Sequence, residues 1–204
     1  MFLRPLIPLL AVAASLAAEA DPDEAFAQSL RCERAGTYVG ARAALAPLDR
    51  RLANDYLYQV RMAWLALCVA DYQAAIAGYR AAQRIEPASL EPRLGLTRAY
   101  LGSQHYAEAD NAARQVLQAD QYNYTAITLL ASALRGEGHP DDAFREISIL
   151  TERYPSDTSA LAFAATLATE SGQTEEAKAL RATLARLEPE QKRQPIAIIQ
   201  STGR

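Results

Sequence analysis

The chain has 204 residues, half of them hydrophobic and 22% charged, with a net charge of −3. This length and composition suit one folded domain with a substantial core. Because basic residues do not outnumber acidic ones, the charge balance argues against a nucleic-acid-binding protein, which needs excess cations to neutralise phosphates.

The first twenty residues differ in texture from the rest of the chain. Arg4 precedes an apolar stretch over residues 6–18, and Ala18-Glu19-Ala20 offers a small-x-small cleavage site. This pattern predicts a secretory signal peptide over residues 1–20 and a mature chain that starts near Asp21. The alternatives are an uncleaved anchor, for which the apolar run is short and interrupted by proline, and a soluble amphipathic start. We expect export, and a periplasmic location in a Gram-negative cell.

Small residues then recur at a fixed interval of 34 residues. Alanine holds one slot throughout, at Ala41, Ala75, Ala109, Ala143 and Ala177. Proline keeps the same phase at Pro87, Pro155 and Pro189, where it is expected to end a helix because it cannot continue the hydrogen-bond ladder. A period of this length predicts a stacked array of helix pairs.

Each interval contains a helix, a turn and a second helix. The first helices carry apolar residues at i, i+3, i+4 and i+7, as in Ile127, Leu130, Ala131 and Leu134. The expected repeats lie near residues 22–55, 56–89, 90–123, 124–157 and 158–189, within a repeat domain over 21–189 and before a C-terminal tail over 190–204. In the first repeat Pro47 interrupts the second helix, so a kink or an early end is predicted there.

The turns inside the repeats and the breaks between them also keep phase. Glycine occupies the turn slot in three repeats and other residues in two, at Gly36, Ala70, Gln104, Gly138 and Gly172. Ser89, Asn123 and Asp157 follow the breaks and are expected to cap the next helix. In the tail, three isoleucines at 196, 198 and 199 are expected to fold back over the last helix; a partner-binding strand or disorder is the alternative.

The clearest repeat resembles the tetratricopeptide pattern. The residues that carry the resemblance are Ala63, Ala75, Tyr79, Ala82 and Pro87, and the other repeats match in register over about residues 22–189. The resemblance implies an all-α, right-handed superhelical solenoid of about five repeats, whose first helices line a groove for protein segments. The groove residues that it implies are Leu57, Val60, Trp64, Leu67, Leu94, Arg98, Leu101, Thr128, Ser132 and Arg135.

Two features qualify that expectation. Some members of the family clamp a C-terminal carboxylate with lysine and asparagine, but this chain has Arg61, Gly95, Leu129 and Phe163 at the asparagine slot and no lysine in the groove. A clamp of that kind is therefore not expected. Trp64 has two interpretations, core packing or partner contact, because its helix is apolar on nearly all sides.

Cys32 and Cys68 are separated by 36 residues, two more than the repeat. Two residues rotate a helix by roughly 200°, so the offset could turn the two sulfurs toward each other on neighbouring first helices. In an exported protein a Cys32–Cys68 disulfide is plausible. The alternative is a pair of buried, unpaired thiols that act as small apolar residues.

Residues suited to catalysis are scarce. His105 and His139 lie in equivalent turns of adjacent repeats, which puts them on the order of 10–20 Å apart, too far to share a metal ion. They are expected to be solvated turn residues. The chain has no phosphate-binding loop, serine nucleophile elbow or zinc-protease motif, so we expect no enzyme and no cofactor.

The predicted function is a periplasmic protein–protein interaction scaffold. Its partners would be protein or peptide segments of envelope proteins, without nucleic acid and without a membrane span in the mature chain. The scaffold would support assembly or export of a pilus, secretion, exopolysaccharide or cell-wall structure. The alternatives are a passive repeat subunit of an envelope complex that makes contact through its ends or tail, and an exported enzyme with a site in the groove.

Overall fold

A computed structural model of the protein describes residues 21–193, and all regular structure in that range is helical. The predicted signal peptide and most of the predicted tail, including its isoleucines, lie outside the described residues. The chain divides into two compact units, unit 1 up to Arg50 and unit 2 from Arg51 onward.

Unit 1 contains the first helix pair. α1 (Pro22–Arg34) packs against α2 (Tyr38–Leu45), and the short 3-10 helix η1 (Ala46–Leu48) follows. The early end predicted at Pro47 is confirmed, because α2 stops two residues before it. Proline fits the start of η1, where its missing N–H is not needed.

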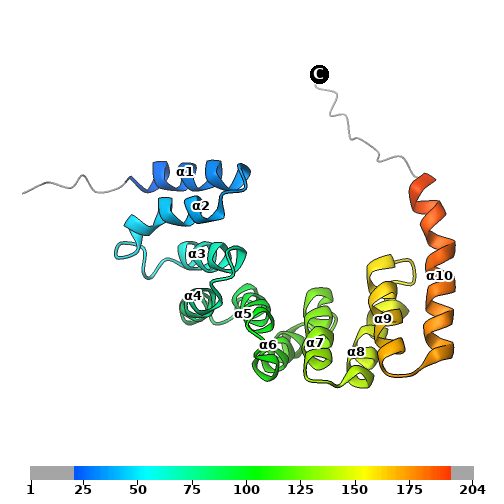
Figure 1. Ribbon diagram of the computed structural model, residues 1–204. Helices are drawn as coiled ribbons and strands as arrows, with labels where there is room; N and C mark the ends of the chain where they lie inside the picture. The colour runs from blue at the N-terminus through cyan, green and yellow to red at the C-terminus, as the bar shows by residue number, and fades with distance from the viewer. Residues whose placement is uncertain (1–20, 194–204) are drawn as a thin grey trace, which may run out of the picture. The chain divides into compact units, whose positions relative to one another are not determined.

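Up to residue 193, unit 2 contains eight helices that pack in chain order. They are α3 (Tyr56–Cys68), α4 (Tyr72–Ile85), α5 (Glu91–Gly102), α6 (Tyr106–Ala119), α7 (Tyr124–Gly136), α8 (Pro140–Arg153), α9 (Thr158–Glu170) and α10 (Thr174–Arg193). The first helices also contact each other, α3 with α5 and α5 with α7. Figure 1 shows α3, α5, α7 and α9 following one another along the inner side of the unit, with α4, α6 and α8 along its outer side. The all-α solenoid predicted from the 34-residue period is confirmed.

The turn inside each helix pair has one backbone conformation. One residue in each turn has a left-handed φ, with values of 72° at Gly36, 57° at Ala70, 61° at Gln104, 85° at Gly138 and 77° at Gly172. The next backbone N–H then reaches back across the turn, as from Asp71 to the Ala66 carbonyl at 2.9 Å. This bond satisfies a carbonyl at the helix end. The slot that the sequence shares among glycine, alanine and glutamine is therefore a single structural position.

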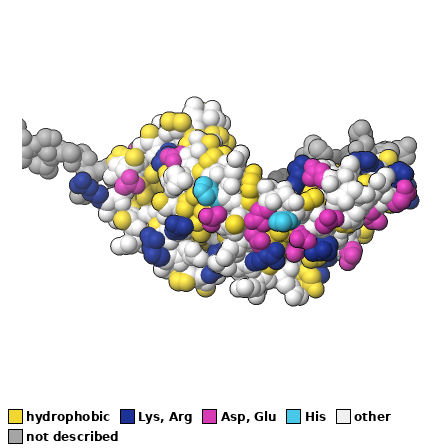
Figure 2. Space-filling model, turned by 60° about the horizontal axis from the view of Figure 1, so that its bottom comes forward, with side chains coloured by type: hydrophobic (Ala, Val, Ile, Leu, Met, Phe, Trp, Pro, Cys, Tyr) yellow, Lys and Arg dark blue, Asp and Glu magenta, His cyan; other side chains and the backbone are white. Residues whose placement is uncertain are grey.

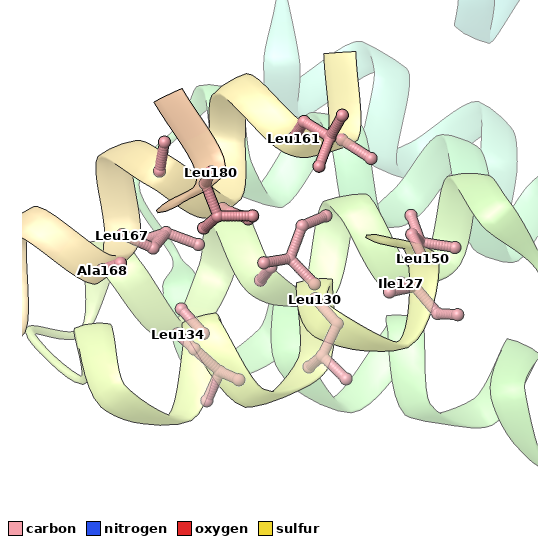
Figure 3. Close-up of a cluster of buried hydrophobic side chains, with 14 of the residues drawn as sticks. Ile127, Leu130, Leu134, Leu150, Leu161, Leu167, Ala168 and Leu180 are labelled. Atoms are coloured by element: carbon pink, nitrogen blue, oxygen red, sulfur yellow. The ribbon is translucent and has the colours of Figure 1, made fainter. Parts of the chain in front are cut away.

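The alanine slot of each second helix lies at a helix crossing. Its five residues are at most 2% exposed. The residue there is small because a larger side chain would push the paired helices apart. Around this slot unit 2 has two hydrophobic clusters, one centred on α3 to α6 and one on α7 to α10. Figure 3 shows side chains from α7, α8, α9 and α10, among them Leu130, Leu150, Leu161 and Leu180, meeting in the second cluster.

Tyrosine rings pack against glycines of the next helix pair. A Cβ atom on Gly102 would lie 2.3 Å from the ring of Tyr72, and one on Gly136 would lie 2.4 Å from the ring of Tyr106. In both cases a tyrosine that begins a second helix covers the glycine that ends the first helix of the next pair. The glycines are required by this close approach.

The helix ends differ from expectation in two places. Asn123 and Asp157 cap their helices as predicted, but Ser89 does not, because α5 begins at Glu91 and the Ser89 hydroxyl lies 2.8 Å from that of Tyr56 instead. Pro189 does not end the last helix, since α10 continues to Arg193. Proline has a helical φ, so a helix can continue past it at the cost of one hydrogen bond and of crowding against the preceding turn.

Candidate protein-binding face

The first helices of unit 2 present matching positions on one side, which we call the first-helix face. Its four rows are Leu57, Glu91, Thr125 and Ser159; Val60, Leu94, Thr128 and Ala162; Trp64, Arg98, Ser132 and Thr166; and Leu67, Leu101, Arg135 and Thr169. Each row steps by 34 residues through α3, α5, α7 and α9, and none of the sixteen residues is buried. The face is therefore a solvent-accessible set of side chains on successive first helices, of which α3 contacts α5 and α5 contacts α7.

All ten residues of the predicted groove belong to this face. Leu57, at 71% exposed, and Arg135 are exposed, and the other eight are half-buried. Trp64 packs against the first hydrophobic cluster, as the interpretation as a core residue predicts, and it keeps part of its surface accessible. Its contact with a partner stays a prediction. The structure thus brings the ten residues to one side of unit 2, while their contact with a partner stays a prediction.

The chemistry of the face changes from α3 to α9. The four positions on α3 are apolar, and those on α5 combine two leucines with Glu91 and Arg98. On α7 the hydroxyls turn inward, since Thr128 donates to the Tyr124 carbonyl at 3.0 Å and Ser132 donates to the Thr128 carbonyl at 2.8 Å. A hydroxyl that donates to its own helix keeps its oxygen as an acceptor for a ligand.

Arg135 is already engaged within the protein. Its guanidinium donates two hydrogen bonds to the Glu170 carboxylate, one of them at 2.8 Å from Nε. This hydrogen-bonded contact raises the pKa of the Arg135 guanidinium. The pair offsets the only positive charge on the α7 part of the face, so that part is electrically neutral.

Tyr79 of α4 reaches the side of α5 that carries the face. A Cβ atom on Gly95 would lie 2.3 Å from Cε1 and Cζ of its ring. The pKa of the Tyr79 phenol is raised to about 12, chiefly by burial; the charge of Glu91 also raises it, and the charge of Arg98 lowers it. Both charged side chains therefore act on the Tyr79 hydroxyl. Tyr79 was singled out from the sequence only as a repeat residue.

The cysteines and histidines remain apart from this face. Cys32 lies in α1, half-buried, and Cys68 is the exposed last residue of α3. The disulfide between them stays a prediction. His105 and His139 are exposed and occupy the N-cap positions of α6 and α8, where they are solvated turn residues as predicted.

The geometry of the described residues adds two further observations. Between residues 21 and 193, no group of three or more His, Cys, Asp or Glu side chains is arranged to hold a metal ion. Over the same range, no helix has both the length and the apolar character needed to span a membrane.

An exposed aromatic cluster lies where two inter-repeat loops meet. The Arg153 guanidinium lies 4.3 Å from the ring centre of Tyr122, and the rings of Tyr124 and Tyr154 are 6.2 Å apart. Burial and a hydrogen bond to Asp157 raise the pKa of Tyr124 to about 12. Tyr154 and Arg153 were not singled out from the sequence. The available signal was their departure from the repeat, which has Glu86 and Ile85, then Asp120 and Ala119, at the same slots.

The outer side of unit 2 has a mixed surface. Figure 2 shows Lys and Arg side chains interspersed with Asp and Glu over the face that it presents. A pocket of about 340 Å³ opens there among α4, α5 and α6. Its arginine, Arg80, donates to the Tyr100 hydroxyl at 2.7 Å, so the guanidinium is already used.

The fold and the first-helix face define a class: an α-helical solenoid of tetratricopeptide-like helix pairs that displays its first helices side by side. Solved structures of MamA have this fold. A double mutant of MamA RS-1 matches with a TM-score of 0.74 at 19% identity, covering 87% of this chain and 100% of that one. MamA from Desulfovibrio magneticus RS-1, from position 41 to its end, matches with a TM-score of 0.71 at 18% identity and the same coverage.

A further MamA crystal structure matches with a TM-score of 0.72 at 14% identity, over 87% of this chain and 97% of that chain. No protein-family model matches the sequence, and no curated protein sequence matches it. At these identities the comparisons establish the fold, and function has to be argued from the face itself.

Proposed function

We propose that this protein is a non-catalytic scaffold that holds segments of other proteins against its first-helix face. It acts in the periplasm, which it reaches through the signal peptide of residues 1–20. There it supports the assembly or export of an envelope structure, such as a pilus, a secretion apparatus, an exopolysaccharide system or the cell wall. The MamA structures support the solenoid fold on which this proposal depends.

One observation carries the proposal: sixteen side chains in register on α3, α5, α7 and α9 are all accessible to solvent. A core would bury them, and a purely polar surface would not place Leu57, Val60, Trp64 and Leu67 together on one helix. Removing apolar surface from water contributes about 25 cal/mol per Å² to the free energy of binding, and tryptophan is a frequent anchor of protein interfaces. A face of this kind binds a partner without needing any catalytic group.

The test is site-specific photo-crosslinking in the cells that produce the protein. A photoreactive residue at position 57 or 101 lies on the first-helix face, and one at position 115 of α6 lies outside it. The expected result is a defined protein adduct at positions 57 and 101 and none at 115, with the partner identified by mass spectrometry. Trp64→Ala should weaken the adduct formed at position 101 while the helical circular dichroism spectrum is unchanged.

The same experiment separates the alternatives. If adducts persist in face variants but disappear when residues 194–204 are deleted, the protein is a repeat subunit that makes contact through its tail, and the face has no binding role. Export is tested separately by fractionation and N-terminal sequencing. A periplasmic chain that begins near Asp21 is expected, and an uncleaved cytosolic chain would contradict the proposed location.

A further inference from the structure

The α5 part of the first-helix face contains a side chain that comes from another helix. Gly95 shares its repeat position with Arg61, Leu129 and Phe163, which fill it with side chains of their own. At Gly95 the Tyr79 ring takes that place, since a Cβ there would lie 2.3 Å from ring carbon Cζ. The phenol end of Tyr79 therefore lies beside α5, within one turn of Arg98.

Two polar groups at this point have no hydrogen-bonding or ion-pair partner among residues 21–193. Tyr79 is only 1% exposed, yet its hydroxyl makes no hydrogen bond with any of those residues. The hydroxyl of a buried tyrosine usually has a partner, and the oxygen of Tyr79 keeps a small accessible surface through which a ligand can reach it. Arg98 is half-buried and makes no hydrogen bond or ion pair within the same range.

Neighbouring arginines show how unusual this is. Arg135 is paired with Glu170, Arg80 donates to the Tyr100 hydroxyl, and Arg93 donates to the Ser89 carbonyl at 3.0 Å. A half-buried guanidinium that no carboxylate of residues 21–193 contacts, next to a tyrosine hydroxyl without a hydrogen-bond partner in that range, has the composition of an anion-binding site whose ligand comes from outside the chain. Glu91 lies close enough for its charge to act on the same hydroxyl, so a bound carboxylate needs the Arg98 charge to offset that of Glu91. The hydroxyl can donate to a carboxylate oxygen while the guanidinium donates to the other.

The surroundings indicate what kind of anion fits. Leu94 and Leu101 flank Arg98 on α5, and Trp64 occupies the equivalent position on α3. Apolar neighbours favour a carboxylate that comes next to a large apolar side chain, because water is excluded from the ion pair. Arg98 lies on the second of the four first helices of unit 2, so a chain that ran from Trp64 and ended at Arg98 would leave α7 and α9 uncovered. This favours an internal acidic residue over a C-terminal carboxylate.

We propose that Arg98 and Tyr79 form a subsite for the side-chain carboxylate of an aspartate or glutamate within a bound protein segment. Trp64, Leu94 and Leu101 bind a large apolar side chain close to that acid. This inference rests on the proposed function, because it assumes that the first-helix face binds protein segments, and it names the chemistry of those segments.

The test is selection of linear peptides on the purified full chain from two random displayed libraries, one with internal random positions and one with free C-termini. Peptides from the internal library that carry Asp or Glu near Phe, Leu or Trp should be enriched. For an enriched peptide, Arg98→Gln should weaken binding about 10- to 100-fold and Tyr79→Phe about 3- to 10-fold. Changing the acid of the peptide to its amide should weaken binding to the parent protein, and it should weaken binding to the Arg98→Gln variant little further.

Arg80→Gln is the matched control, because it removes an arginine of unit 2 that lies outside the first-helix face and donates to the Tyr100 hydroxyl; its effect on peptide binding should be less than threefold. Enrichment of peptides that lack an acid, or acidic peptides that bind Arg98→Gln as well as the parent, would overturn the subsite and leave the proposed function standing. Enrichment only from the free C-terminal library would replace the internal acid with a terminal carboxylate, and so overturn the proposal.

No enrichment from either library, with the chain folded by circular dichroism, would contradict the proposed binding of segments itself. Failure of the subsite and failure of the proposed function are thereby distinguished. Tyr79→Phe keeps the ring that packs on Gly95, so the loss of binding in that variant reports the hydroxyl and not the packing.

Discussion

Ala70 and Gln104 hold a backbone conformation that glycine holds in the other three turns. Their φ values of 57° and 61° lie in the left-handed region, where a Cβ atom costs about 1 kcal/mol or more. The turn tolerates the strain because the backbone N–H that follows each residue still reaches its carbonyl, as from His105 to Tyr100 at 2.9 Å. The fold therefore imposes the conformation on residues that do not favour it.

Glycine at these two positions should stabilise the protein. Ala70→Gly and Gln104→Gly each relieve left-handed strain but add chain entropy to the unfolded state, so a net gain of about 0.5–1 kcal/mol in the free energy of unfolding is expected. Urea denaturation checks it. Gly138→Ala, at a φ of 85° with open space around its Cβ position, should lose stability for the same reason. A loss in Ala70→Gly would contradict the argument.

Tyr79 should make the protein sensitive to alkali. Its pKa is about 12 in the folded state, mainly because of burial, against 10 for an ordinary tyrosine. Below pH 10 both states keep the proton and this contribution to stability is complete. Between pH 10 and 12 the unfolded state releases the proton first, so the free energy of unfolding falls by up to about 3 kcal/mol.

Tyr79→Phe removes this titration. The loss of stability between pH 8 and pH 11 should therefore be smaller in the variant than in the parent protein, as measured by urea denaturation at both pH values. Equal losses in the two proteins would show that Tyr79 does not carry the effect.

At the scale of helices, the contacts between tyrosine and glycine join one pair to the next. Tyr106 begins α6 and covers Gly136 at the end of α7, as Tyr72 of α4 covers Gly102 of α5. In both cases the ring belongs to the second helix of one repeat and contacts the first helix of the next repeat. A methyl group on the glycine has no room unless the ring moves.

Gly136→Ala should destabilise the protein by about 1–3 kcal/mol, because the new Cβ would meet ring carbons of Tyr106 at 2.4 Å. Combining it with Tyr106→Ala should cost less than the sum of the two single changes, since the clash is removed with the ring. Urea denaturation of the four proteins in this cycle is the measurement. Additive costs would mean that the ring and the glycine do not interact.

For the molecule as a whole, the predicted Cys32–Cys68 disulfide would join a helix of unit 1 to one of unit 2. A bridge between residues 36 apart would stabilise the protein by about 3–4 kcal/mol through the unfolded state. Protein purified without reductant should be 2 Da lighter than reduced protein, the mass of two hydrogens, and Cys68→Ser should abolish the difference. An unchanged mass on reduction would leave two separate thiols.

The period of the sequence was sufficient to predict the solenoid and the helix pairs, and the family resemblance supplied the groove residues on the first helices that became α3, α5 and α7. Periodicity succeeds because equivalent residues in stacked repeats have equivalent surroundings. It could not predict Tyr79 at Gly95 or Arg135 with Glu170, since these contacts join non-equivalent positions on different helices. They depend on the direction and length of individual side chains. Pro189 was misjudged because a proline forbids one hydrogen bond and not the helical φ.

The packing of successive first helices also sets the spacing of side chains along the face. Packed helices lie about 8–10 Å apart, and an extended chain advances about 3.3 Å per residue. Since α3 contacts α5 and α5 contacts α7, a segment laid across them meets a new helix about every three residues. The spacing of the helices therefore fixes the spacing of the residues that a bound extended segment places on them. An apolar side chain over Trp64 and an acid over Arg98 would be about three residues apart in any partner, wherever they occur in its sequence.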